Sequence, residues 1–324
     1  MPLRARTASP LRKSLEWPFL LALPGAIPIL LGIGCALLKS GLRSRDGYVG
    51  SERCIACHGK LHPQTVAAWR ASRHHVTMQP VRGRAGDASF VIGRQDRRHV
   101  QVRRDMQILP SGGWQDDEVP APHDAIAAEG CRVDAADHCL GCHTTGYFVA
   151  RREFAEPGVG CEACHGPGKK HADSRGARIE IVDPAMLSRP RQNMVCGQCH
   201  SLGKDPSGAH PFPVMREGGA VAPFQPGQDL ALGFVDAKPK LERKGWEYSL
   251  FVRAVEEYAR QLCTDCHDPH GRAGNPSMLK DPTNETCLRC HGLGRARLRF
   301  ENHGAVGNVT SKLCWSCHRN AHSH

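Results

Sequence analysis

Residues 139–165 read CLGCHTTGYFVARREFAEPGVGCEACH and carry the pattern Cys-x-x-Cys-His at both ends. The same pattern occurs seven times in the 324 residues, and we number the copies motifs 1 to 7 in chain order: Cys54–His58, Cys139–His143, Cys161–His165, Cys196–His200, Cys263–His267, Cys287–His291 and Cys314–His318. Chance gives about 0.05 such matches in this composition. Seven copies therefore indicate one chemical requirement that is repeated along the chain.

The spacing within the motif suits covalent attachment of haem. Two thiols three residues apart reach the two vinyl groups of a porphyrin, and the His that follows binds the iron. We therefore predict seven covalently bound haem c groups. The predicted thioether cysteines are Cys54, Cys57, Cys139, Cys142, Cys161, Cys164, Cys196, Cys199, Cys263, Cys266, Cys287, Cys290, Cys314 and Cys317. The predicted proximal iron ligands are His58, His143, His165, His200, His267, His291 and His318.

Other uses of paired cysteines fit the pattern less well. A structural zinc site needs two paired Cys units, or a Cys pair with a distant His pair, and gives no reason for a His directly after every second Cys. A redox disulfide within Cys-x-x-Cys does not require that His either. Cys35 and Cys131 are the two cysteines outside the motifs, and we interpret Cys131 as a buried or free thiol.

The composition is poor in the residues of an ordinary apolar core. Aromatic residues make up 6% of the chain. The 34 glycines and 23 prolines among 324 residues are more than the usual shares of about 7% Gly and 5% Pro would give. From motif 1 to motif 7 there are about 38 residues per haem, too few to wrap each porphyrin separately. We therefore expect a haem-cored protein, mostly α and irregular coil with a small β-hairpin region. The net charge of +11 offsets roughly 14 propionate charges on seven haems, so we expect no nucleic-acid partner.

Local patterns predict several elements between the motifs. Residues 62–75 (HPQTVAAWRASRHH) favour a helix with Pro63 in its first turn. Residues 90–109 alternate in polarity as a small β-hairpin or three short strands would. Residues 203–240 are rich in Pro and Gly and favour a loop, whereas residues 247–262 favour a helix leading into motif 5.

These elements, with the apolar N-terminal segment described next, suggest a division of the chain around the loop. We interpret the loop as the boundary between a four-haem region and a three-haem region. The predicted segments are a cytoplasmic N-terminus (1–16), a transmembrane signal anchor (17–38), the four-haem region (39–205), a Pro/Gly-rich linker (206–246) and the three-haem region (247–324).

The N-terminal segment predicts the compartment. Trp17 to Leu38 read WPFLLALPGAIPILLGIGCALL, an uncharged stretch long enough to span a bilayer. Basic residues precede it, which favours a cytoplasmic N-terminus. We expect a single-pass protein of the cytoplasmic membrane whose body lies in the periplasm or extracytoplasmic space of a bacterium. A cleaved signal peptide and a lipoprotein modified at Cys35 are the alternatives, and both also place the body outside the cytoplasm.

Histidines outside the motifs supply candidates for the second axial ligand. His270 follows the motif residue His267 by three positions and lies on the same side of its own haem, so we expect it to bind a neighbouring iron. His171, six residues after His165, follows the same logic. The distal candidates are His74, His75, His171, His270, His303 and His322. We expect His on both faces of most irons, which gives low-spin haems of mostly negative potential, whereas Met would raise the potential.

Several segments resemble known multihaem cytochromes. YVGSERCIACH, HPQTVAAWRASRHH, CLGCHTTGY, PGVGCEACHGPGKKH and MVCGQCHSLG, between residues 48 and 203, resemble relatives of the tetrahaem electron acceptor of hydroxylamine oxidoreductase. CTDCHDPHG followed by NETCLRCH, within residues 263–318, resembles the doubled Cys-x-x-Cys-His motif of electron-transfer cytochromes. The resemblance implies His171, His270 and one of His74 and His75 as distal ligands. The chain departs from the tetrahaem relatives in having seven motifs and an apparent anchor.

Two functions follow from these expectations. The first is an electron carrier that connects a membrane or periplasmic donor, such as a quinol oxidoreductase module or a soluble cytochrome, to a redox partner. The second is an oxidoreductase that acts on a small nitrogen or sulfur compound at a five-coordinate haem. All seven motifs keep His, so the replaced motif residue that often marks a catalytic haem is absent. A subunit of an extracellular cytochrome polymer is a third reading, against which the apparent anchor argues.

Overall fold

The structure is a computed structural model that describes residues 45–81, 88–93, 99–108, 134–236, 261–271, 278–291 and 314. The chain divides into two units, residues 1–41 and 42–324, and every described residue belongs to the second unit. The predicted anchor at 17–38 therefore lies outside the described residues, as do Cys131 and residues 247–260 of the helix predicted at 247–262. The last two residues of that prediction, Gln261 and Leu262, are described and are not helical. Within the described part, no helix has both the length and the apolar character needed to cross a membrane.

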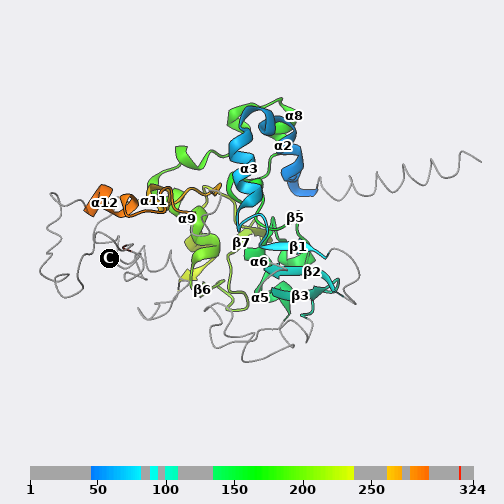
Figure 1. The fold of residues 1–324 in the computed structure, drawn as a ribbon. Coiled ribbons are helices and arrows are strands. Elements are labelled where there is room, and N and C mark those ends of the chain that lie inside the picture. Colours follow the sequence, from blue (N-terminus) through cyan, green and yellow to red (C-terminus); the bar gives the residue numbers. More distant parts are fainter. Residues whose placement is uncertain are drawn as a thin grey trace, which may run out of the picture. The chain divides into compact units, whose positions relative to one another are not determined.

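Short helices joined by coil carry the motifs (Figure 1). The α-helices are α2 (Ser51–Leu61), α3 (Pro63–Ala71), α5 (Ala135–His138), α6 (Leu140–His143), α7 (Cys161–His165), α8 (Lys169–Asp173), α9 (Arg189–His200), α11 (Cys263–Cys266) and α12 (Glu285–His291). Single 3-10 turns are η1 (Arg45–Gly47), η3 (Val149–Arg151), η4 (Arg178–Glu180), η5 (Pro184–Met186) and η6 (Leu230–Leu232). Most of these helices are a turn or two long, so packing around the motifs, rather than intrinsic propensity, must hold them.

The strands form small antiparallel sheets. The strands are β1 (Met78–Pro80), β2 (Ala88–Gly93), β3 (His99–Arg103), β4 (Thr144–Thr145), β5 (Glu156–Pro157), β6 (Gly203–Lys204), β7 (Val214–Glu217), β8 (Ala220–Pro223) and β9 (Val235–Asp236). The largest sheet has the order β1-β2-β3, and β4 pairs with β5, β6 with β9 and β7 with β8. Strands are therefore more widespread than the sequence led us to expect.

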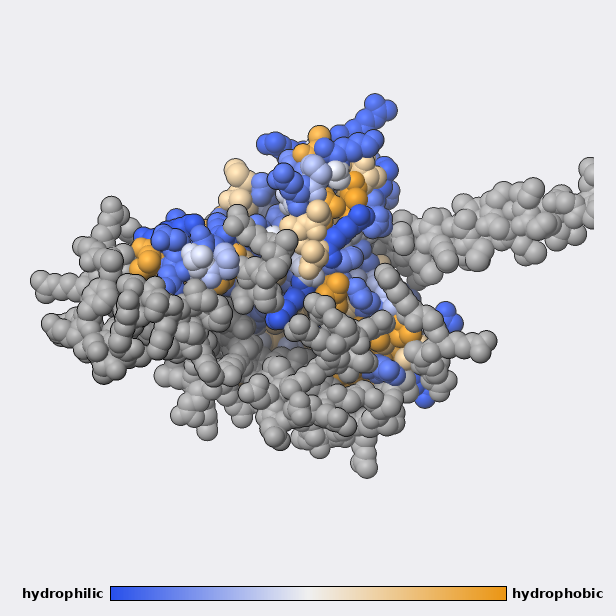
Figure 2. Space-filling view, in the orientation of Figure 1, coloured by the Kyte–Doolittle hydropathy of each residue, from blue (hydrophilic) through white to orange (hydrophobic). Residues whose placement is uncertain are grey.

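A compact apolar core lies between the three-stranded sheet and motif 2. Its buried residues are Met78, Ile92, Val100, Val102, Ile108, Ala135, Ala136, Cys139, Leu140, Tyr147, Phe212 and Val214. We expected porphyrins alone to supply the buried interior. The structure shows that these side chains also form a core of their own. On the face shown in Figure 2, apolar residues are scattered among hydrophilic ones over the described part of the chain.

The local predictions had different outcomes. The helix expected at 62–75 is confirmed as α3, with Pro63 at its first position, although it ends at Ala71. The strands expected at 90–109 are confirmed by the antiparallel pairing of β2 with β3. The loop expected at 203–240 is wrong for much of its length, because β6 to β9 lie there and a second apolar cluster forms from Met215, Phe224, Leu230 and Phe234. Its role as a boundary between two haem regions stays a prediction.

Candidate haem-binding site

Each described motif forms about one helical turn. Within such a turn the two Cys side chains, three residues apart, lie on the same face, and the His follows within the same turn. Motif 3 occupies the whole of α7, and motif 4 ends the longer helix α9. The local geometry therefore presents both thiols and the imidazole to one side, as attachment of a porphyrin requires.

Motifs 1 and 3 are joined by a buried carboxylate. Glu162 lies between the two cysteines of motif 3 and is 2% exposed. Its oxygens accept hydrogen bonds from the backbone N–H groups of Val49 (2.9 Å), Gly50 (2.7 Å) and Gly168 (2.7 Å). One side chain thus ties the segment before motif 1 to the segment that follows its own motif. Glu162 was not predicted from the sequence, because an acidic residue between the motif cysteines carries no signal of its own.

Contacts between cysteines place further motifs next to one another. The thiols of Cys142 and Cys199 are in hydrogen-bond contact, which joins motif 2 to motif 4. The thiol of Cys196 contacts that of Cys263, which joins motif 4 to motif 5. The side-chain amide of Gln198 donates to the Ala163 carbonyl at 3.0 Å, so motif 4 also touches motif 3. The first five motifs are therefore neighbours in space although they span more than 200 residues.

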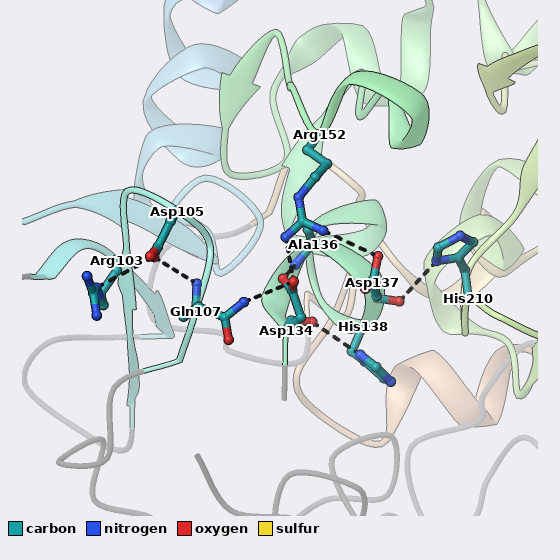
Figure 3. Close-up of polar contacts among 9 residues, drawn as sticks. All are labelled: Arg103, Asp105, Gln107, Asp134, Ala136, Asp137, His138, Arg152 and His210. Atoms are coloured by element: carbon teal, nitrogen blue, oxygen red, sulfur yellow. Dashed lines mark hydrogen bonds and ion pairs between the residues drawn. The ribbon is translucent and has the colours of Figure 1, made fainter. Parts of the chain in front are cut away.

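A polar cluster holds the helix α5 in front of motif 2 (Figure 3). The Asp134 carboxylate accepts a hydrogen bond from the Ala136 N–H at 2.9 Å and pairs with Arg152. Arg152 also approaches Asp137 at 4.0 Å, and the Asp137 carbonyl lies 3.3 Å from Nδ1 of His210. This cluster connects the start of motif 2 to segments before and after it.

Three motif histidines face a histidine from a distant part of the chain. The ring centroids are 6.2 Å apart for His58 and His171, 6.3 Å for His165 and His270, and 6.4 Å for His200 and His74. In each pair one member belongs to a motif and the other is a distal candidate from the sequence. His58 also stacks on His62 at 5.8 Å, but His62 follows it by four residues, so helix geometry accounts for that contact.

The partner residues of several imidazoles fix their orientation. Nδ1 of His165 lies 2.9 Å from the Val182 carbonyl, and Nδ1 of His171 lies 3.0 Å from the Ala177 carbonyl. Nδ1 of His74 lies 3.3 Å from the carbonyl of Pro269, next to His270. When Nδ1–H donates to a carbonyl, the unprotonated Nε2 is left to bind a metal. Thr77 plays a related role for motif 2, since its hydroxyl is 2.9 Å from Nδ1 of His143.

The electrostatic surroundings favour neutral imidazoles. Burial, followed by the neighbouring His62 and His171, lowers the pKa of His58. Burial and His200 lower the pKa of His74, and burial and His165 lower the pKa of His270. Neutral imidazole is the form that coordinates a metal, so these surroundings suit axial ligation.

The three pairs fit the dimensions of an iron held between two imidazoles. A metal–imidazole bond is about 2 Å long, so two rings on opposite sides of one metal ion hold their centres about 6 Å apart. The separations of 6.2–6.4 Å agree with this value. The donor set therefore fits a haem with two His ligands at motifs 1, 3 and 4.

The remaining predicted residues are placed differently or lie outside the described part. His75 lies with its ring 4.3 Å from that of Trp69, rather than opposite a motif histidine. His303 and His322 are outside the described residues, as are Cys317 and His318 and the side chains of Cys290 and His291. Their predicted roles stay predictions.

With these motifs and their paired histidines in place, the chain is a multihaem c-type cytochrome that carries a doubled Cys-x-x-Cys-His motif. Residues 256–296 match the family model described as doubled CXXCH motif, and residues 117–166 match cytochrome c554 and c-prime. The resemblance seen in the sequence is thereby confirmed, and so is covalent binding of haem c.

Known proteins extend this likeness over more of the chain. It is 28% identical over 215 residues to the multiheme cytochrome MtrA of Shewanella baltica, covering 57% of this chain and 62% of that protein. It is 27% identical over 208 residues to the C-type polyheme cytochrome OmcB of Geobacter sulfurreducens, covering 61% of this chain and 24% of OmcB. The chain thus spans less than two thirds of either relative. The fold is similar to that of the outer cell wall cytochrome OcwA, with a TM-score of 0.50, 20% identity, and coverage of 76% of this chain and 67% of that one.

Proposed function

We propose that this chain is a heptahaem electron carrier, with one haem c at each of the seven motifs. The three cross-motif histidine pairs, with ring centroids 6.2–6.4 Å apart, are the observation that carries the proposal. An iron with His on both sides has no open position for a substrate, so such a site favours electron transfer over catalysis. When bound, haem supplies an iron that changes between its ferric and ferrous states.

The chain's own residues set the conditions for that change. Carbonyl oxygens at Val182 and Ala177 orient the imidazoles of His165 and His171 and strengthen their basicity. His171 follows motif 3 yet faces motif 1, and His270 follows motif 5 yet faces motif 3. When haem is bound, each of these histidines would link the backbone near one attachment site to the iron at another, which would keep neighbouring sites at a fixed spacing.

The compartment and the partners belong to the same proposal. We propose that residues 17–38 anchor the protein in the cytoplasmic membrane with its body outside the cytoplasm, near membrane donors. The donor is then a quinol oxidoreductase module or a soluble cytochrome, and the acceptor is another redox protein. Retention of the uncleaved chain in membranes after a carbonate wash supports the anchor, whereas a mature protein that starts beyond residue 38 contradicts it.

The carrier proposal is tested by spectra of the purified, haem-loaded protein. A pyridine haemochrome assay with intact mass is expected to count seven haems. The oxidised protein is expected to show low-spin signals and no spectral change with cyanide or nitrite. A clear high-spin fraction that binds either ligand, together with turnover of a small nitrogen or sulfur compound, would overturn the carrier proposal in favour of an enzyme.

A further inference from the structure

The backbone N–H at the first cysteine of motifs 3 and 5 needs a partner from outside its helix. Cys161 begins α7 and Cys263 begins α11. The first N–H groups of a helix have no acceptor within the helix. A preceding Ser, Thr, Asp or Asn usually caps this end, but Gly160 and Leu262 stand there and have no side-chain oxygen.

In each case the acceptor is a side-chain oxygen from a different motif. The Ser51 Oγ accepts from Cys161 N at 3.0 Å, and the Asn193 Oδ1 accepts from Cys263 N at 3.0 Å. The Asn284 Oδ1 accepts from Cys314 N at 2.6 Å. Ser51, Asn193 and Asn284 each stand three residues before the first cysteine of their own motif, which is motif 1, 4 or 6. The same sequence position therefore makes the same contact three times.

Asn193 is the strongest case, because it is a buried amide in the middle of a helix. It lies inside α9 and is 8% exposed, although Asn is a poor helix residue and a buried amide is costly unless it is hydrogen-bonded. Both ends of its amide bind the segment at motif 5, because Nδ2 also donates to the Gln261 carbonyl at 3.1 Å. Asn193 thus holds the entry to motif 5 at two points against motif 4.

The other two residues are oriented in a comparable way. Ser51 is 3% exposed, and its hydroxyl donates to Glu156 Oε1 at 2.7 Å, which leaves a lone pair for Cys161. Asn284 directly precedes α12, and its carbonyl accepts from the N–H groups of Cys287 and Leu288 in that helix. Its side-chain oxygen accepts from Cys314 of motif 7. Each residue therefore lies in or directly before the helix that carries its own motif and contacts a second motif.

A separate observation supports the same pairs. The thiol of Cys54 contacts that of Cys161, and the thiols of Cys196 and Cys263 are likewise in contact. The thiol of Cys287 contacts that of Cys314. Motif 2 has Ala136 at the corresponding position and lacks this oxygen, so its neighbour relation to motif 4 depends on other contacts.

We propose that Ser51, Asn193 and Asn284 are positioning residues that dock the attachment motifs in the pairs 1–3, 4–5 and 6–7, by capping the first N–H of the partner motif. The docking fixes the spacing of neighbouring haem attachment points, and Asn193 connects the proposed four-haem and three-haem regions. This inference rests on the proposed electron-carrier function and adds the residues that set the pairing.

Single substitutions in the haem-loaded full chain test the proposal. Asn193→Ala removes both contacts to motif 5, and Ser51→Ala removes one contact to motif 3. Gln192→Ala is the matched control, because Gln192 lies in the same helix and, within the described part of the chain, its amide bonds the nearby Ala185 and Leu187 carbonyls. Two quantities are measured. The first is the hydrogen-exchange rate of the capped amide, which is Cys263 N–H for Asn193 and Cys161 N–H for Ser51. The second is the set of paramagnetically shifted haem methyl resonances, followed through a redox titration.

The expected result is specific to each pair. In Asn193→Ala the Cys263 amide exchanges about 10- to 100-fold faster, and the resonances and potentials of two haems change. In Ser51→Ala two different haems change, and in Gln192→Ala none do. Equal changes over all haems, or variants that match the control, overturn the proposal.

The outcomes also separate this proposal from the one on which it rests. If Asn193→Ala does not accumulate, the smaller Ser51→Ala change gives the same reading at the pair 1–3. A wild-type protein without covalent haem ends the proposed function itself. A haem-loaded, redox-active wild type whose variants behave like Gln192→Ala ends only the docking role.

Discussion

Loss of the Glu162 carboxylate should loosen the junction between motifs 1 and 3. The side chain is 2% exposed and accepts from three backbone N–H groups at 2.7–2.9 Å. Hydrogen bonds to a charged group contribute about 1.5–3 kcal/mol each, and a buried N–H left unpaired costs about 1–3 kcal/mol. Glu162→Ala is therefore expected to lower the free energy of unfolding by about 3–6 kcal/mol, since water entering the space restores part of the loss. Glu162→Gln keeps one oxygen but turns an NH2 group toward backbone donors. It is expected to lower the free energy of unfolding by about 2–3 kcal/mol.

The measurement is guanidinium unfolding of the haem-loaded protein, followed by circular dichroism, with hydrogen exchange at Val49, Gly50 and Gly168 as the local reading. Glu52→Gln is the control, because Glu52 lies in α2 with its side chain 68% exposed, and exposed ion pairs contribute below about 1 kcal/mol. If Glu162→Gln unfolds at the same denaturant concentration as Glu52→Gln, and the three amides stay protected, the reasoning about this carboxylate is refuted.

Three further predictions concern other parts of the site. His270→Met should convert one low-spin His-ligated haem into a His/Met haem of higher potential. Substitution of the exposed His138 by Ala should leave the haem potentials unchanged. Equal redox titration curves for the two variants would count against His270 as a ligand. Gly158→Ala should lower the free energy of unfolding by about 1–3 kcal/mol or more, because φ is +78° and the new Cβ would lie 2.6 Å from the His75 carbonyl oxygen. Gly208→Ala has a similar φ of +76° but open space around the new Cβ. Comparing the two variants in the same unfolding assay separates backbone strain from the steric clash. Burial raises the pKa of Tyr48 to about 12. The contribution of the neutral phenol to stability is therefore complete below pH ~10, and about 2–3 kcal/mol of it is lost as the pH rises toward ~12. Tyr48→Phe should flatten this decline in the free energy of unfolding, and parallel plots of that free energy against pH for the two proteins would contradict the prediction.

The elements that the sequence predicted correctly depend on local information. Pro63 sets the start of α3 because its fixed φ suits the first helical position. The alternation in residues 90–109 correctly predicted strands there, because side chains of β2 and β3 on one face pack in the apolar core. The motifs themselves needed no tertiary information, since thiol and imidazole spacing within one turn decides the chemistry.

The choice between His74 and His75 shows where local information ends. Both follow α3, and nothing in their immediate sequence separates them. His74 faces His200 across 126 positions of chain, whereas His75 packs on Trp69. The path of the chain decides which ring faces a motif histidine, so one sequence alone leaves the choice open.

The hairpin of β7 and β8 was missed although a signal was present. Gly218 and Gly219 separate the two strands and both have positive φ, at +56° and +85°. Two glycines between short apolar-alternating stretches are a signal for a two-residue β-hairpin turn. The many glycines and prolines nearby led to the expectation of a loop. The role of Glu162 could not be predicted, because its three donors come from backbone far away in the sequence or across its own motif.

The central claim is that a motif histidine and a histidine from outside the motifs hold the same iron. The most direct measurement is an experimental structure of the haem-loaded protein that resolves the axial ligands. The account predicts one iron between His58 and His171, one between His165 and His270, and one between His200 and His74. An iron on the motif 1 histidine that is bound by His62 instead, or that has no second protein ligand, would contradict it.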